Sequence, residues 1–269
     1  MFCGRLMPLY IYPLDIMISF VTAVKLMPGY EDYQKRLEMY VESIAAHSRV
    51  EYEIIVVEDQ SGANLRLLRD CFPLEWWAAK GARLIEYEAV YPNPHGYNMI
   101  EAYAKNVGLR AARFPYVCVT NCDVLFNAAF FELCASGLQS NVFYRFLEYE
   151  TPAVAAWELA GIEASFGDAV CINPDLADPH KWSLKTIAFK SGDAMLLDRR
   201  SWEKVEGFPE NEVWVHSDLI VCTVVNNNRI PLHVPTEAKV YTYPQDRALV
   251  EKPFELAKSY EYLERVACN

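Results

Sequence analysis

The stretch that most constrains the fold is Phe114 to Phe126, which reads FPYVCVTNCDVLF. A break at Phe114-Pro115 leads into five residues that predict a buried β-strand, and this strand runs out into Asn121-Cys122-Asp123. A carboxylate just past the carboxyl end of a buried strand lies where open α/β sheets bind their ligands. Asp123 is therefore the first candidate site residue. Its alternative role is to cap the turn and the helix that we expect from about Asn127.

Buried β-runs alternate with helices along the first half of the chain. Strands are expected at Ile16 to Val24, Glu53 to Val57 and Arg83 to Ala89, and helices at about Glu31 to His47, Leu65 to Cys71 and Asn98 to Arg113. This order predicts an α/β fold with a Rossmann-like, mostly parallel central sheet that is flanked by crossover helices.

The second half of the chain has a different texture. Strand-like runs are expected at Val142 to Glu150, Phe189 to Asp198 and Lys239 to Tyr243, and largely helical segments at Ser201 to Gly207, Val213 to Asn226 and Pro253 to Val266. Between them, Thr151 to Ser183 is rich in Ala, Pro, Asp and Trp and has weak periodicity. We interpret this segment as a loop-rich substrate region, because long irregular segments inside compact domains are often functional.

Charge and cysteine usage limit the partners and the compartment. The formal net charge of -11, without any Lys/Arg run, argues against nucleic acid, because a polyanion is bound through a basic patch. A phosphate ligand has to be met locally by cations, backbone N–H groups or a metal. Eight scattered cysteines without zinc spacing are typical of a reducing compartment, so we expect a cytoplasmic protein. The apolar N-terminus is interrupted by Pro8, Pro13 and Asp15, so we expect no transmembrane segment.

Several segments resemble a known family when they are taken in order. EIIVVEDQSG, KNVGLRAARFPYVCVTNCDVLF and KSGDAMLLDRRSWEKVEGFPE, followed by HSDL, resemble the GT-A-fold glycosyltransferases, especially the inverting family-2-like enzymes. The similarity spans roughly Ile16 to Tyr243. It implies one GT-A domain over residues 1–269, with a nucleotide-sugar-binding half at 16–126 and an acceptor-binding, catalytic half at 127–269.

The resemblance implies an enzyme of glycan biosynthesis. Such an enzyme moves a sugar from a nucleoside diphosphate sugar, with a UDP-sugar favoured, to an acceptor hydroxyl. In the donor site, Thr22 would lie by the nucleobase, Asp59 would accept a hydrogen bond from it, and Glu58 would reach the ribose. Lys105 and Asn106 would face the diphosphate or the sugar. The alternatives are a solvated Asx turn for the acidic pair and a solvated helix face for Lys105.

The DxD-like motif of the resembled family departs from its usual form here. Asn121-x-Asp123 stands where the family often has two aspartates, so one anionic ligand is replaced by an amide. Asp123 would bind Mn²⁺ or Mg²⁺, both of which favour oxygen ligands, and the metal would bridge it to the diphosphate. Tyr241-Thr242-Tyr243 stands near the position of a metal-binding His in many members, and His233 is a possible substitute.

The resemblance also places the acceptor and the catalytic base in the second half. Gly192, Asp193 and Glu210 would contact sugar or acceptor hydroxyls. Asp218 would be the base that deprotonates the acceptor, since it begins an apolar segment where a helix N-terminus keeps it ionised. Asp218 has an alternative role as a helix cap, and His216 is the second candidate for the base.

Two other functions compete with the transferase. A sugar nucleotidyltransferase would need a Gly-rich loop with Arg and Lys after its first strand, but SFVTAVKLMPGY has a single Gly. A non-catalytic nucleotide- or sugar-binding module with the same fold is the other alternative, because a fold alone does not determine a function.

Overall fold

The computed structural model describes residues 16–27, 32–61, 66–88, 99, 101–153, 157–183, 186–187, 193–210 and 217–244. The first half contains β1 (Met17–Val24), α1 (Tyr33–His47), β2 (Glu51–Asp59), α2 (Leu68–Cys71), α3 (Leu74–Ala79), β3 (Ala82–Tyr87), α4 (Glu101–Ala111), β4 (Tyr116–Asn121) and β5 (Val124–Phe126). The second half contains α5 (Ala128–Ser136), β6 (Phe143–Arg145), β7 (Leu147–Glu150), α6 (Leu159–Ala164), β8 (Val170–Cys171), β9 (Ala194–Asp198), α8 (Arg199–Lys204), α9 (Ser217–Asn227), β10 (Leu232–His233) and β11 (Lys239–Thr242). Three short 3-10 helices, Ser165–Asp168, Pro174–Ala177 and Pro179–Lys181, lie between α6 and β9.

A seven-stranded sheet runs through the centre of the described part of the chain, in the order β10-β6-β9-β4-β1-β2-β3. The strands β3, β2, β1 and β4 are parallel, β9 is antiparallel to both of its neighbours, and β10 is parallel to β6. In the register of the four parallel strands, Val21 lies opposite both Ile55 and Val119. The expected α/β class with a mostly parallel central sheet is confirmed.

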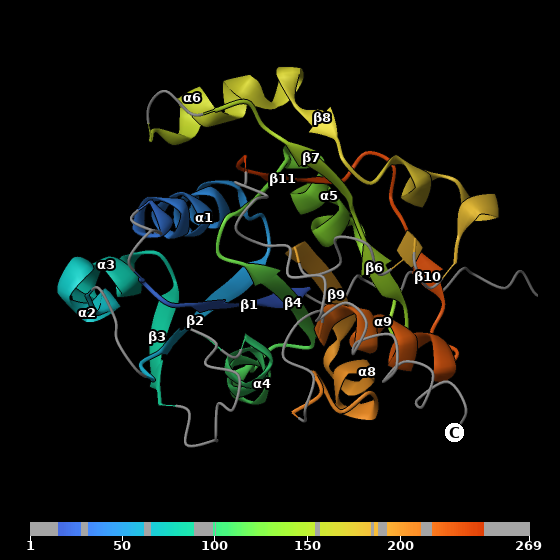
Figure 1. Cartoon of the computed structure of the whole chain (residues 1–269), viewed down its shortest axis with the longest axis horizontal. Helices are drawn as coiled ribbons and strands as arrows, with labels where there is room; N and C mark the ends of the chain where they lie inside the picture. The colour runs from blue at the N-terminus through green and yellow to red at the C-terminus, as the bar shows by residue number, and fades with distance from the viewer. Residues whose placement is uncertain are drawn as a thin grey trace, which may run out of the picture.

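Helices cover both faces of this sheet (Figure 1). On one face, Phe20 and Ile54 share a core with Tyr40 of α1. On the other face, Val21 packs in a core with Ala104 of α4 and Trp202 of α8. The alternation of inward side chains along β1 therefore builds two separate cores. The α4 helix approaches β1 very closely at Gly108, where an added Cβ would lie 2.3 Å from Cγ1 of Val21.

A four-stranded sheet, in the order β5-β11-β7-β8, lies beside the central sheet. Only Cys122 and Asp123 separate β4, in the central sheet, from β5, in this smaller sheet. Its aromatic side chains pack in a small core of their own, in which the rings of Phe166 and Tyr241 stack with centroids 3.7 Å apart. This second sheet was not among the expectations from the sequence.

Several predicted boundaries differ from the structure. The strand expected at Val142 to Glu150 is divided by Phe146 into β6 and β7, which belong to different sheets. The loop-rich segment contains α6 and the short 3-10 helices, and α3 was not predicted. The helix expected from Ser201 begins at Arg199, because the side chain of Asp198 accepts the N–H of Ser201 and caps it. The helix expected at Pro253 to Val266 lies outside the described residues.

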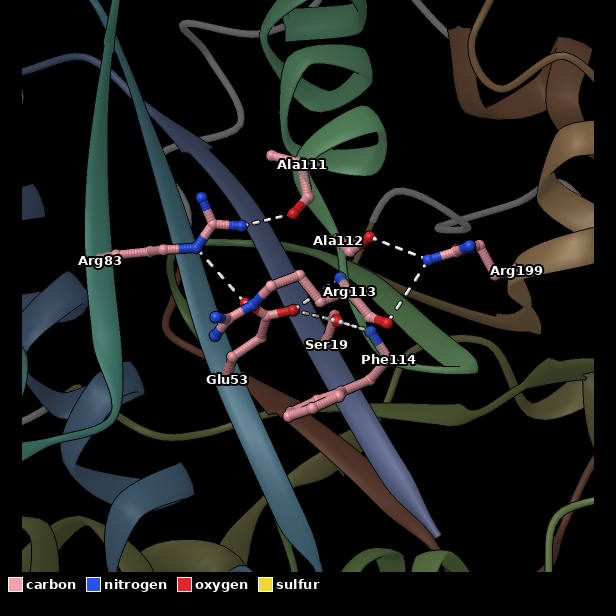
Figure 2. A network of polar contacts seen from close by, with 8 residues as sticks. All are labelled: Ser19, Glu53, Arg83, Ala111, Ala112, Arg113, Phe114 and Arg199. Carbon is pink, nitrogen blue, oxygen red and sulfur yellow. Dashed lines mark hydrogen bonds and ion pairs between the residues drawn. The ribbon is translucent and has the colours of Figure 1, made fainter.

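The buried carboxylate of Glu53 forms a network of hydrogen bonds at the edge of the sheet where β1, β2 and β4 begin (Figure 2). Glu53 Oε1 accepts hydrogen bonds from Ser19 Oγ at 2.7 Å and from the backbone N–H of Arg113 at 2.7 Å. Its Oε2 accepts from Nε of Arg113 at 2.9 Å and of Arg83 at 3.3 Å. Burial alone would raise the pKa of Glu53, but these hydrogen bonds outweigh burial and lower the pKa below its ordinary value.

Within the described residues, no helix is both long and apolar enough to cross a membrane.

Candidate functional site

The carboxyl ends of β1, β2 and β4 meet at one edge of the central sheet. In register, Ala23 of β1 lies opposite Val57 of β2 and Asn121 of β4, so the residues that follow these strands come together. The first is Lys25, which is buried and donates a hydrogen bond to the carbonyl of Ser61 beyond β2. The second is the Asn121 to Asp123 turn. This edge is where ligands bind in open α/β sheets.

Asp123 is buried and faces a cation from α1. Nη1 of Arg36 lies 3.3 Å from Oδ2 of Asp123, and Nη2 of Arg36 lies 2.7 Å from Oδ2 of Asp32. The guanidinium is also packed against two rings, with its central carbon 5.3 Å from the ring centroid of Tyr33 and 5.2 Å from that of Tyr243. Burial by itself would lower the pKa of Arg36, but the two carboxylates outweigh burial and raise it, so the guanidinium is charged.

A second cation reaches the same turn from α4. Nζ of Lys105 donates to Oδ1 of Asn121 at 2.9 Å and pairs with Glu101, and its side chain is only 2% exposed. Nδ2 of Asn121 in turn donates to Oδ1 of Asp193 at 2.9 Å. The amide of Asn121 therefore links a buried lysine to a buried aspartate, and a carboxylate could not donate in this way.

The acidic pair at the end of β2 is used inside the fold. Both residues are buried. Glu58 Oε1 accepts the backbone N–H of Leu68 at 2.6 Å, at the start of α2, and Asp59 Oδ1 accepts the N–H of Ser61 at 2.8 Å. Burial raises the pKa of Glu58, and the hydrogen bond from Leu68 offsets part of this effect. The Asx turn that was the alternative at Asp59 is present, but it is buried and not solvated.

Thr22 lies within the sheet and not at its edge. It pairs with Val56 and Thr120 in the register, its side chain is fully buried, and its hydroxyl has no hydrogen-bond partner among the described residues. By the alternation along β1, Thr22 lies on the face of Phe20, which packs against α1. The expectation that Thr22 contacts a nucleobase stays a prediction.

Asn106 joins α4 to the segment after α8. Its Oδ1 accepts the N–H of Phe208 at 2.8 Å, and its Nδ2 donates to the Phe208 carbonyl at 2.7 Å and to Oε1 of Glu210 at 2.8 Å. Arg110 contacts the same carboxylate oxygen of Glu210 at 2.9 Å. Gly207 has φ of +72°, and a Cβ there would lie 2.5 Å from Asn106 Oδ1. These contacts hold Asn106 and Glu210 together.

The remaining predicted residues lie in the second half. Asp193 is buried just before β9, and Asp218 is partly buried in the first turn of α9. Gly192 and His216 lie outside the described residues. His233 is exposed in β10, where its ring lies edge-on to Tyr144.

The structure adds two residues that sequence reasoning missed. Arg36 lies on the predicted helix at about Glu31 to His47 but was given no role there, and its contact with Asp123 joins positions 87 residues apart. Tyr243 was seen only as a departure from a metal-binding His, whereas its ring packs on the guanidinium of Arg36. Burial raises the pKa of Tyr243, so its hydroxyl is protonated at neutral pH.

The donor set bears on whether this site fits a divalent cation. No three His, Cys, Asp or Glu side chains among the described residues lie close enough to hold a metal by themselves. However, Asp123 offers a buried carboxylate, and Mg²⁺ is commonly bound through one or two carboxylates together with substrate phosphates. Carboxylates also outnumber cations around the turn. Asp32 and Asp123 contact Arg36, Glu101 contacts Lys105, and Asp193 contacts Asn121. The residues therefore fit a cation that is completed by a phosphate ligand.

Comparisons with known proteins find structural likeness only. No protein-family model and no curated protein sequence matches this chain. Solved structures of Staphylococcus aureus TarS do match. TarS 1-349 in complex with UDP-GlcNAc is 13% identical with a TM-score of 0.57, over 86% of this chain and 59% of that chain. TarS 1-349 in complex with UDP is 14% identical with a TM-score of 0.53, over 87% and 62%.

A third structure, TarS without a ligand in its description, is 14% identical with a TM-score of 0.56, over 85% of this chain and 37% of that chain. This chain thus spans between 37% and 62% of the length of these TarS chains, which is less than two thirds. At such low identity the likeness concerns the fold alone. It shows that this chain has a GT-A-like fold, with a mostly parallel central sheet flanked by helices.

Proposed function

We propose that this protein is a glycosyltransferase that takes a sugar from a nucleoside diphosphate sugar, with UDP as the favoured nucleotide, and transfers it to an acceptor hydroxyl. One observation carries the proposal. Asn121 and Asp123, at the carboxyl end of β4, are each contacted by a buried or nearly buried cation, Lys105 and Arg36. Two cations at this edge of a GT-A-like fold suit an anionic diphosphate. The complexes of TarS with UDP-GlcNAc and with UDP add support.

The proposed division of labour follows the two halves of the chain. Residues 16–126 would bind the nucleotide sugar, and residues 127–269 would bind the acceptor and supply the base. Inverting transfer requires the acceptor hydroxyl to attack the anomeric carbon from the face opposite the diphosphate while it loses its proton. We assign the role of accepting that proton to Asp218, in the N-terminal turn of α9, where the helix dipole favours a negatively charged side chain. His216 is the second candidate.

Other residues would bind and orient the substrates. Gly192, Asp193 and Glu210 would contact hydroxyls of the sugar or the acceptor. Asp193 already accepts a hydrogen bond from Asn121. A sugar contact at Asp193 would therefore be linked to the Asn121 to Asp123 turn, where the diphosphate is proposed to bind. Asp123 would hold Mn²⁺ or Mg²⁺ together with the diphosphate oxygens, and such a cation would offset charge on the leaving diphosphate.

The test has a binding arm and a turnover arm. Isothermal titration calorimetry with UDP-, GDP- and dTDP-sugars, each with Mn²⁺, is expected to show binding of at least one donor, and Asp123→Asn is the matched site variant. The bound donor is then incubated with a panel of hydroxyl acceptors, and the anomeric configuration of the product is read by NMR. Absence of binding to any donor at millimolar concentration would refute the proposal. Binding without turnover on any acceptor would favour the non-catalytic module.

A further inference from the structure

The guanidinium of Arg36 is held more tightly on one side than on the other. Its Nε donates to Asp32 Oδ2 at 2.8 Å and its Nη2 lies 2.7 Å from the same oxygen, whereas Nη1 approaches Asp123 Oδ2 only to 3.3 Å. Hydrogen bonds between a guanidinium and a carboxylate are ordinarily about 2.7–2.9 Å long. The contact with Asp123 is the looser one, so Nη1 is the atom that can exchange partners while Asp32 keeps the guanidinium in place.

Among the residues that the structure describes, some N–H groups of Arg36 have no acceptor. A guanidinium has about five N–H groups in a planar fork. The contacts with Asp32 and Asp123 occupy one N–H on each of the three nitrogens, and no other hydrogen bond of Arg36 is made within the described residues. A planar fork with spare donors matches the geometry of phosphate oxygens.

Tyr243 provides a second and independent sign of a ligand. Its side chain is 2% exposed, and its hydroxyl has no hydrogen-bond partner among the described residues. A buried hydroxyl without a partner is unfavourable, so such groups in folded proteins usually meet an acceptor. The ring of Tyr243 lies against the same guanidinium, 5.2 Å from its central carbon. Within the described residues, these donors without a partner therefore belong to two side chains that lie against each other, one of which contacts Asp123.

We propose that Arg36 and Tyr243 form a subsite for the diphosphate of the donor, in which Nη1 of Arg36 and the hydroxyl of Tyr243 donate to phosphate oxygens. This inference rests on the proposed function. Arrival of the diphosphate exchanges the 3.3 Å contact between Nη1 and Asp123 for a phosphate contact. As the bond between the sugar and the diphosphate breaks, the diphosphate keeps the electron pair, and donors already in position stabilise the added charge.

The experiment compares UDP with UMP, which lacks the second phosphate, as ligands in calorimetry. Arg36→Lys keeps the charge but loses the fork, and Tyr243→Phe removes only the hydroxyl. Charge-assisted hydrogen bonds are worth enough that we expect Arg36→Lys to weaken UDP binding about tenfold or more and Tyr243→Phe about fivefold, with smaller effects on UMP. Arg49→Lys, in an exposed pair with Glu132, and Tyr241→Phe, in β11 two residues before Tyr243, are the matched controls and are expected to bind UDP normally.

The outcomes separate this inference from the proposed function. If the wild-type protein binds UDP and both variants, folded by circular dichroism, bind it within about twofold of wild type, Arg36 and Tyr243 are structural and the inference is wrong. Equal losses for UDP and UMP also overturn it, because the contact is then not with the diphosphate. If the wild-type protein binds no nucleoside diphosphate, the proposed function fails and this inference fails with it.

Discussion

Replacing Glu53 tests how the starting edge of the central sheet is held together. Glu53→Ala leaves two donors without an acceptor, the buried hydroxyl of Ser19 and the part-buried backbone N–H of Arg113. An unsatisfied buried donor costs about 1–3 kcal/mol and a part-buried one less, so we expect the free energy of unfolding to fall by about 1–4 kcal/mol. The contacts from the guanidinium groups of Arg113 and Arg83 to Glu53 contribute less to stability. These side chains are 68% and 36% exposed and can bind water when the carboxylate is removed.

Glu53→Gln separates the hydrogen bonds from the charge. The amide oxygen can still accept from Ser19 and from the N–H of Arg113, but the NH₂ group faces the guanidinium donors that contact Oε2. We expect a cost of only about 0.5–1.5 kcal/mol, since both guanidinium groups reach solvent. Glu203→Gln, at an exposed pair with Arg199, is the matched control and is expected to change stability by less than about 0.5 kcal/mol.

The pH dependence of the free energy of unfolding shows whether the charge of Glu53 stabilises the fold. The pKa of Glu53 lies below its ordinary value of 4.5 in the folded protein, because hydrogen bonds outweigh burial. A lowered pKa contributes stability that is fully present above the unfolded value and is lost as the pH falls through the folded value. Urea unfolding followed by tryptophan fluorescence should therefore show a difference in the free energy of unfolding between wild type and Glu53→Gln at neutral pH. This difference should shrink as the pH falls below the ordinary pKa of 4.5.

Two results would refute this reasoning about Glu53. One is a Glu53→Ala variant that is no less stable than Glu53→Gln, since the buried donors would then not depend on the carboxylate. The other is a gap between wild type and Glu53→Gln that stays constant as the pH falls.

Three further predictions concern the proposed site and the packing beneath it. Asp123→Ala should abolish transfer with the fold intact, and EDTA should lower the rate, whereas full activity in EDTA would show that side-chain cations neutralise the diphosphate. Asp218→Asn should lower kcat at least about a hundredfold with donor affinity nearly unchanged. A near-normal kcat for Asp218→Asn, together with a large loss of kcat for His216→Ala, would instead identify His216 as the base. Gly108→Ala should lower the free energy of unfolding by about 1–3 kcal/mol, because the new Cβ would lie 2.3 Å from Val21 Cγ1; an unchanged urea midpoint would mean that α4 moves away freely.

The sequence was sufficient for those parts of the fold that depend on local pattern. The strand that ends at Asn121 and the helix that begins after Asn127 were predicted, and the side chain of Asn127 does accept the N–H of Phe130 as a cap. Apolar runs of five or so residues identify buried strands because both faces of a parallel sheet are covered. The same runs do not reveal which sheet a strand joins, so the division of Val142 to Glu150 at Phe146 was missed.

The candidate site was predicted less completely, for a physical reason. Asp123 was located by its place after a strand, which is a local property. The partner of Asp123 was not, because a contact between α1 and the end of β4 depends on the packing of the two elements. Asn106 illustrates a second limit. The resemblance implies that it faces the diphosphate or the sugar, and this stays a prediction, whereas the sequence did not indicate that its hydrogen-bonding atoms contact Phe208 and Glu210. The sequence pattern does not show whether such an amide contacts a ligand or links two parts of the fold.

The short joint between the two sheets has a mechanical consequence for Asp123. Cys122 and Asp123 are all that lies between the last residue of β4 and the first of β5. A link of two residues spans about 7 Å at most, so neither strand can move far without moving the link. Asp123 thus lies between two strands of buried residues, and a displacement of either sheet shifts its backbone. The position of the Asp123 carboxylate therefore depends on how the two sheets are placed relative to each other.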